Sequence, residues 1–172
     1  PADIVFGTPL TAAQLNAAAN VSGDFIYTPA SGTLLDANLG QQLQVIFNPS
    51  APGFVSVSAS VTINVLKAVP TITWNDPTSI GFGTPLTITQ LNATSAVPGT
   101  FTYNPEVGTV LGIGNDQVLS TTFTPDADGN YETNTAQVNI DVLEALDFGD
   151  APANYPVTLA NNGARHIAGS LR

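Results

Sequence analysis

The sequence predicts an all-β protein made of tandem antiparallel β-sandwiches, each with one short helical turn. The first observation is a period of two, in which apolar side chains alternate with polar ones, as expected of strands with one buried face. It is clearest in "SVTINVLKA" and "QVNIDVLEA", residues 60–68 and 137–145. The second is composition: 43% of residues are hydrophobic and only 9% charged. Such a balance favours strands with hydroxyl-rich outer faces over charged helices.

An internal duplication predicts that the fold occurs twice. The segment "FGTPLTAAQLNA" at 6–17 returns as "FGTPLTITQLNA" at 82–93. Aligning residues 1–68 with residues 77–145, with Asn130 as one extra residue, gives 32 identities in 68 paired positions. A unit of about 70 residues is long enough to fold as a small domain and too long for a solenoid rung.

Short strands and turns follow one another in the same order in both copies. In the first copy, alternation predicts strands around Phe25–Tyr27 and Leu43–Phe47, and in the second around Phe101–Tyr103 and Leu119–Phe123. Segments rich in Pro and Gly, "PASG", "PSAPG", "PEVG" and "PDADG", predict the turns between them. Several short strands with such punctuation are typical of a sandwich.

In the duplicated segments 6–17 and 82–93, Thr and Gln are spaced as they are at the N-terminus of a helix. Thr11 with Gln14, and Thr87 with Gln90, match a capping box, in which the hydroxyl and the amide each satisfy a backbone N–H at a helix N-terminus. Leu15 is then expected to enter the core from a single helical turn. We interpret the stretch as a strand-to-helix corner, and a ligand-binding loop is the alternative.

The junction "AVPTITWNDP", residues 68–77, predicts an additional strand before the second copy, because Ile72 and Trp74 alternate with threonines. No such strand precedes the first copy. The predicted domains are therefore repeat 1 at 1–68 with its first strand missing, repeat 2 at 69–145, and a partial C-terminal module at 146–172. Either the first strand belongs to a longer array of repeats, or a neighbouring molecule supplies it by β-augmentation and builds a filament.

Charge excludes two classes of partner. The net charge is −10, and residues 1–164 hold all 13 acids and a single base, Lys67, so that 1 − 13 = −12. Attraction to nucleic acid or to an anionic lipid surface is therefore unfavourable. There is no cysteine, hence no disulfide and no thiolate chemistry, and no apolar stretch long enough to predict a membrane span.

Oxygen-bearing side chains in "PDADGNYETN" form the one candidate metal site. They are Asp126, Asp128, Asn130 and Glu132, whose alternate spacing is similar to the start of a Ca²⁺ loop. The later bidentate Glu of such a loop is absent, and the first copy has no acid there. A solvated hairpin turn is the alternative, and no other cofactor is predicted.

In the C-terminal segment, Asp147 and Asp150 precede Arg165, and we expect an ion pair that pins this segment. A frayed terminus is the alternative. The adjacent His166 is the sole histidine, and no motif supplies a Ser to complete a triad with it. The sequence therefore predicts that the chain is not an enzyme.

The segment "PTITWNDPTSIGFGTPLTITQLNATSAVPGTFTYNPEVGTVL" resembles the immunoglobulin-like repeats of very large bacterial surface and secreted proteins. The segment "LDFGDAPANYPVTLANNGARH", residues 146–166, resembles a module of bacterial adhesin-like proteins. These resemblances imply an extracellular or cell-surface location and a stalk, spacer or cohesive role without enzymatic activity. The partners would be neighbouring repeats or cell-surface material. A filament subunit assembled by strand donation, and a glycan- or cell-binding module, are alternatives.

Overall fold

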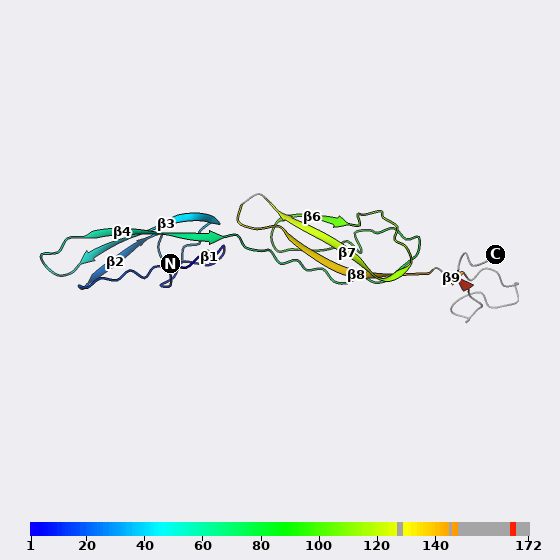
Figure 1. The fold of residues 1–172 in the computed structure, drawn as a ribbon, viewed down its shortest axis with the longest axis horizontal. Coiled ribbons are helices and arrows are strands. Elements are labelled where there is room, and N and C mark those ends of the chain that lie inside the picture. Colours follow the sequence, from blue (N-terminus) through cyan, green and yellow to red (C-terminus); the bar gives the residue numbers. More distant parts are fainter. Residues whose placement is uncertain (127–128, 145, 148–165, 168–172) are drawn as a thin grey trace. The chain divides into compact units, whose positions relative to one another are not determined.

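The computed structural model describes residues 1–126, 129–144, 146–147 and 166–167 (Figure 1). The described residues form strands and no helix, so the all-β prediction is confirmed. The chain divides into two compact units. Unit 1 contains residues 1–71, 96–100 and 124–134, and unit 2 contains residues 72–95, 101–123 and the described residues from 135 onward.

The first sheet has four strands in the order β1-β4-β3-β2. The strands are β1 (Ile4–Val5), β2 (Gly23–Thr28), β3 (Asn38–Pro49) and β4 (Val57–Leu66). Strands β2, β3 and β4 are antiparallel neighbours, as predicted. The short β1 lies parallel to β4, with Ile4 opposite Val65, because β1 reaches β4 by a crossover and not through a hairpin.

The second sheet repeats this order as β5-β8-β7-β6. Its strands are β5 (Ile80–Gly81), β6 (Gly99–Asn104), β7 (Gly114–Pro125) and β8 (Asn134–Leu143). The parallel pair recurs as well, with Ile80 opposite Val142. A separate antiparallel pair is formed by β9 (Leu146–Asp147) and β10 (His166–Ile167). The duplication in the sequence is thus a duplication of topology.

Each four-stranded sheet carries one apolar cluster, to which the duplicated corner contributes. In unit 1, Leu10 and Leu15 of the corner are buried with Leu43, Ile63 and Val65 of the sheet. The cluster of unit 2 has the residues that match these five and, in addition, buried Val138 and partly buried Trp74, whereas Phe6, which packs on the unit 1 cluster, has no counterpart in it. Among the described residues no second sheet faces either of these two, and the loop bearing the corner covers the apolar face instead.

The corner has the hydrogen bonds of a capping box but stops short of a helix. The Thr11 N–H donates to Gln14 Oε1 at 3.0 Å, and the Ala13 N–H donates to Thr11 Oγ1 at 3.2 Å. One helical bond follows, from the Leu15 N–H to the Thr11 carbonyl at 2.9 Å. The expected helical turn is therefore an isolated turn, because a single bond of this kind does not propagate into a helix.

The segment 70–76 forms no regular strand. Within unit 2 it makes one isolated bridge, between Thr73 and Thr94. The prediction of a first strand for repeat 2 is therefore not confirmed, because the segment forms one isolated bridge and no strand. In unit 1 the first element of the given chain is β1, at Ile4–Val5.

Candidate functional site

An open apolar groove lies on the inner face of the first sheet, which we call the β4 groove. It is bounded by residues 14–19 on one side and by residues 57–61 of β4 on the other, with β3 as its floor. Two adjoining hollows of about 130 Å³ and about 120 Å³ make it up. They are continuous, because Ala17, Val45 and Ala59 line both.

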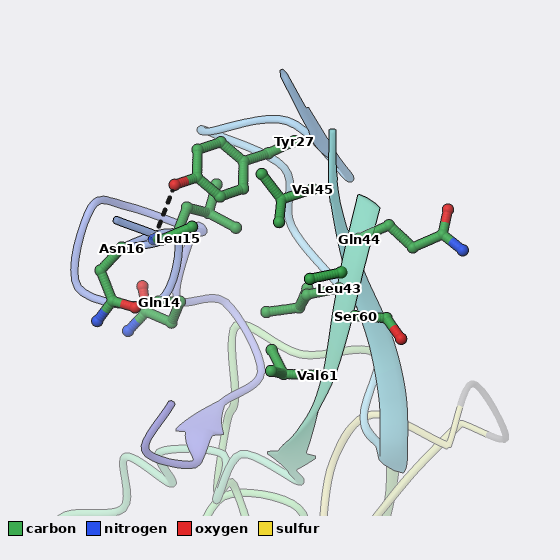
Figure 2. A pocket seen from close by; sticks show the side chains of 11 residues that line it. Gln14, Leu15, Asn16, Tyr27, Leu43, Gln44, Val45, Ser60 and Val61 are labelled. Atoms are coloured by element: carbon green, nitrogen blue, oxygen red, sulfur yellow. Dashed lines mark hydrogen bonds between the residues drawn. The ribbon is translucent and has the colours of Figure 1, made fainter. Parts of the chain in front are cut away.

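Side chains of the two strands give the groove its apolar character. Figure 2 shows Leu43, Val45 and Val61 pointing from the strands toward the loop, while Gln44 and Ser60 point away on the other face. This is the alternation that the period of two predicts. The groove is therefore lined by hydrocarbon, with polar side chains on the opposite face of the sheet.

The far wall of the groove is held by a tyrosine. The Ala17 N–H donates to the Tyr27 hydroxyl at 2.9 Å, the dashed line in Figure 2. Tyr27 stands on β2 and packs with its ring stacked on that of Phe25, their centroids 6.3 Å apart. Because the hydroxyl is anchored to the loop, residues 14–17 keep a defined distance from the sheet and the groove stays open.

The wall formed by β4 is exposed to solvent, whereas the matching strand of unit 2, β8, is partly buried. Val61 has 51% of its surface exposed, whereas the matching Val138 of β8 has 6%. Along β4 the first six residues are all exposed, while β8 alternates between partly or fully buried and exposed residues. An apolar position of the sheet is thus left in contact with solvent in unit 1.

In unit 2 the segment 72–76 covers the matching position. The Trp74 ring packs edge-on against Tyr103 with centroids 5.4 Å apart, and the Trp74 Nε1–H donates to the Gln90 carbonyl at 3.0 Å. Ala93, which matches Ala17 of the groove, is buried there with 8% exposed. Residues of unit 2 that lie beneath the segment 72–76 are therefore buried, whereas the matching residues of unit 1 are exposed.

Hydrogen bonds fix this covering segment on both sides. Thr73 and Thr94 exchange two N–H to carbonyl bonds of 2.8 and 2.9 Å. On the β8 side, the Asn139 N–H donates to Asp76 Oδ1 at 2.9 Å. The segment is thus bonded to the loop on one side and to the edge of β8 on the other.

Burial has an electrostatic consequence in unit 2. It raises the pKa of the Tyr103 phenol above its usual 10.0, and a hydrogen bond with the backbone of Ala93 opposes the rise. The side chains lining the β4 groove are apolar or uncharged. The groove is therefore suited to apolar side chains and to backbone hydrogen bonding.

The predicted calcium ligands have different surroundings. Asp126 and Glu132 are exposed, and Asp128 lies outside the described residues. Asn130 is buried within unit 1, where its Oδ1 accepts from the Ala37 N–H at 2.7 Å and its Nδ2 donates to Asp36 Oδ1 at 3.1 Å. Across the part of the chain that the structure describes, no three His, Cys, Asp or Glu residues gather as a metal site would require. The calcium site stays a prediction.

The predicted ion pair of the C-terminal segment also stays a prediction. Asp150 and Arg165 lie outside the described residues. Asp147 is described through its backbone, which pairs with His166 between β9 and β10. This pairing sets Leu146 and Asp147 beside Ile167 and His166.

Comparison with known proteins assigns no relative: no family model matches the chain, and no curated protein matches it. No helix with the length and hydropathy of a membrane span occurs in the described ranges.

The β4 groove was not predicted from the sequence. The signal that could have located it is the pair of differences between the copies, namely "TITW" before repeat 2 alone and the run Ala17–Ala19 in place of "ATS" at 93–95. What remained hidden was that these two differences meet in space. Only the fold shows that the segment 72–76 lies over the place that matches the groove.

Proposed function

We propose that the chain is a non-enzymatic structural segment of a bacterial extracellular repeat protein, serving as a stalk, spacer or cohesive element at the cell surface. The observation that carries the proposal is that one topology is built twice from the same framework residues. The side chains shared by the two copies are core and turn residues such as Leu10 and Leu86, both with 0% exposed. Duplication of framework without duplication of reactive groups favours architecture over catalysis.

The framework is duplicated down to the geometry of its aromatic rings. Phe25 and Phe47 have ring centroids 4.7 Å apart at 37°, and Phe101 and Phe123 have theirs 4.6 Å apart at the same angle. We further propose that each repeat belongs to the immunoglobulin-like β-sandwich class. The strand order, the isolated bridges beside the sheets and the resemblance of the repeat sequence support this assignment.

The location is tested by labelling cells of the organism that produces the chain. Antibodies raised against the purified chain are expected to label intact, unpermeabilised cells or their extracellular material. An antibody against a cytoplasmic protein, which should stain only after permeabilisation, serves as the control. Labelling that requires permeabilisation would contradict the proposal.

The mechanical role is tested on single molecules. A chain held between two marker domains and pulled is expected to show two unfolding events of similar length, one for each repeat. A variant with Leu86→Ala is expected to lower the force of one event and leave the other unchanged. A single event for the whole chain, or extension without measurable force, would contradict a stalk that resists tension.

A further inference from the structure

We propose that the peptide bond between Asp76 and Pro77 is a self-cleavage site, at which the Asp76 side chain attacks its own main chain in acid and leaves two pieces that stay bound to each other. This is the one place in the chain where an aspartate directly precedes a proline. The bond lies between the covering segment 72–76 and β5. Cleavage here is independent of the structural role proposed above.

The chemistry follows from the two residues that form the bond. In acid the Pro77 nitrogen takes up a proton, since the nitrogen of a tertiary amide is more basic than an ordinary peptide nitrogen. A carboxylate oxygen of Asp76 then bonds to the main-chain carbonyl carbon of the same residue, the bond from that carbon to the Pro77 nitrogen breaks, and a cyclic anhydride forms. A water molecule opens the anhydride. The products are a chain ending in Asp76 with two carboxyl groups and a chain beginning with the secondary amine of Pro77.

The surroundings of the bond leave it open to this reaction. Asp76 and Thr78 are both exposed, so water and acid reach the bond from solvent. In the part of the chain that the structure describes, none of residues 75–78 takes part in a hydrogen bond between main-chain groups. The carbonyl carbon of Asp76 can therefore become tetrahedral without breaking a ladder. Because the nucleophile belongs to the same residue, its effective concentration is high.

The Asp76 carboxylate is held by an uncharged group. Its Oδ1 accepts from the Asn139 N–H at 2.9 Å, and within the described ranges its Oδ2 has no hydrogen-bond partner in the protein. The charged side chain nearest to Asn139 along the same face of β8 is Asp141, whose Oδ1 accepts from the Asp116 N–H. The loop 91–98 and β5 carry no charged residue. One carboxylate oxygen is thus free to attack, and no basic side chain of these neighbours neutralises it.

The covering segment keeps its contacts after cleavage. They come from residues on the N-terminal side of the cut, namely the two bonds that Thr73 makes with Thr94 and the bond from Trp74 to the Gln90 carbonyl. Asn130, which belongs to the C-terminal piece, stays buried and hydrogen-bonded inside unit 1. The cleaved chain is therefore a non-covalent pair, in which the covering segment has become a strand with a free end.

The test uses the purified full chain at the lowest pH, from about 3 upward, at which circular dichroism shows it folded. A synthetic peptide of residues 71–80, "TITWNDPTSI", serves as the reference for the same bond without a fold. Mass spectrometry of denatured samples should show the pieces 1–76 and 77–172, whose masses add up to the mass of the chain plus one water. The folded chain should be cleaved at a rate within about tenfold of that of the peptide.

Matched variants identify the attacking group. Asp76→Asn keeps a side-chain oxygen that can accept from the Asn139 N–H but lacks the carboxylate, so it should fold and be cleaved at least about tenfold more slowly. Asp126→Asn makes the same change at another exposed aspartate and should be cleaved at the wild-type rate. Pro77→Ala keeps the carboxylate and removes the tertiary amide, and should also slow cleavage at least about tenfold.

The pairing of the pieces is tested after the sample is returned to neutral pH. Size-exclusion chromatography should elute the two pieces together, and denaturant should separate them. Three results would overturn the inference: cleavage of the folded chain more than about tenfold slower than that of the peptide, equal cleavage of wild type and Asp76→Asn, and pieces that elute apart without denaturant. Surface labelling of cells is unaffected by any of these results, so the structural role is tested separately.

Discussion

Two matching positions in the repeats, Gly40 and Asp116, adopt the same left-handed backbone conformation with different residue types. At the irregular start of β3, Gly40 adopts φ 67°, and the matching residue on β7, Asp116, adopts φ 53°. Both backbone N–H groups donate to a side chain of the neighbouring strand, Asn64 in one case and Asp141 in the other, at 2.9 Å. The backbone conformation is thus dictated by the fold, and Asp116 holds it at some steric cost.

Replacing Asp116 by Gly should therefore raise the free energy of unfolding of repeat 2 by about 0.5–1 kcal/mol, because a left-handed residue loses its steric penalty. The bond to Asp141 uses the backbone N–H and is retained. Urea denaturation measures the change. Gly40→Ala is the matched control and should lower the free energy of unfolding of repeat 1 by a similar amount. Equal stability of Asp116→Gly and wild type would refute this interpretation of the turn.

The buried phenol of Tyr103 predicts a specific loss of stability at high pH. Its pKa is raised by burial above the unfolded value of 10.0, so the protonated form is favoured in the folded state. That contribution to stability is fully present below pH 10 and is lost as the pH rises through the folded pKa. The free energy of unfolding, measured from about pH 8 upward, should fall less steeply above the unfolded pKa in Tyr103→Phe than in wild type. Parallel curves would contradict the assignment.

At the scale of elements, most of the strands were predictable and two features were not. Strands β2, β3, β4, β6, β7 and β8 fall where the alternation of apolar residues placed them. The capping-box spacing correctly predicted the hydrogen bonds of the corner, but not that the turn would end after one helical bond. Alternation in "TITW" predicted a strand, but the segment forms only one isolated bridge, between Thr73 and Thr94. A regular strand requires hydrogen-bonding neighbours that are remote in sequence, and local alternation does not identify them.

The covering segment should contribute strongly to the stability of unit 2. Truncating Trp74 to Ala removes the contact with Tyr103 and the bond to the Gln90 carbonyl, and should lower the free energy of unfolding by about 2–4 kcal/mol. Hydrogen exchange should also quicken at residues 93–94 and 136–139. Val55→Ala, at a residue 78% exposed, is the control and should change stability by less than about 0.5 kcal/mol. A loss below about 1 kcal/mol would show that the segment is not a structural cover.

At the scale of the whole molecule, the acidic surface governs the response to ions. The chain has a net charge of −10, so its negatively charged groups repel one another, and dissolved ions screen that repulsion. Any divalent cation is thus expected to stabilise the chain in a general way. A specific calcium site would add to this effect, and the two can be separated experimentally.

We expect chelator to leave the melting temperature of the purified chain unchanged, and Ca²⁺ and Mg²⁺ at equal ionic strength to raise it equally. The reason is that the side chain of Asn130 is already hydrogen-bonded to Asp36 and Ala37 and has little freedom to turn toward a metal ion. Differential scanning calorimetry measures the effect. A rise specific to Ca²⁺ that Asp126→Asn removes would establish the calcium site instead.

The sequence by itself determined the all-β class, the duplication, the order of the long strands and the apolar residues of the core, because these follow from local periodicity and from comparing two copies. Only the tertiary structure decided that β1 pairs in parallel with β4 and that the segment 72–76 covers one sheet and not the other. Both depend on contacts between residues far apart in the chain, which local patterns do not encode. The β4 groove belongs to this second kind, since it is defined by what the fold leaves open beside Ala59 and Val61.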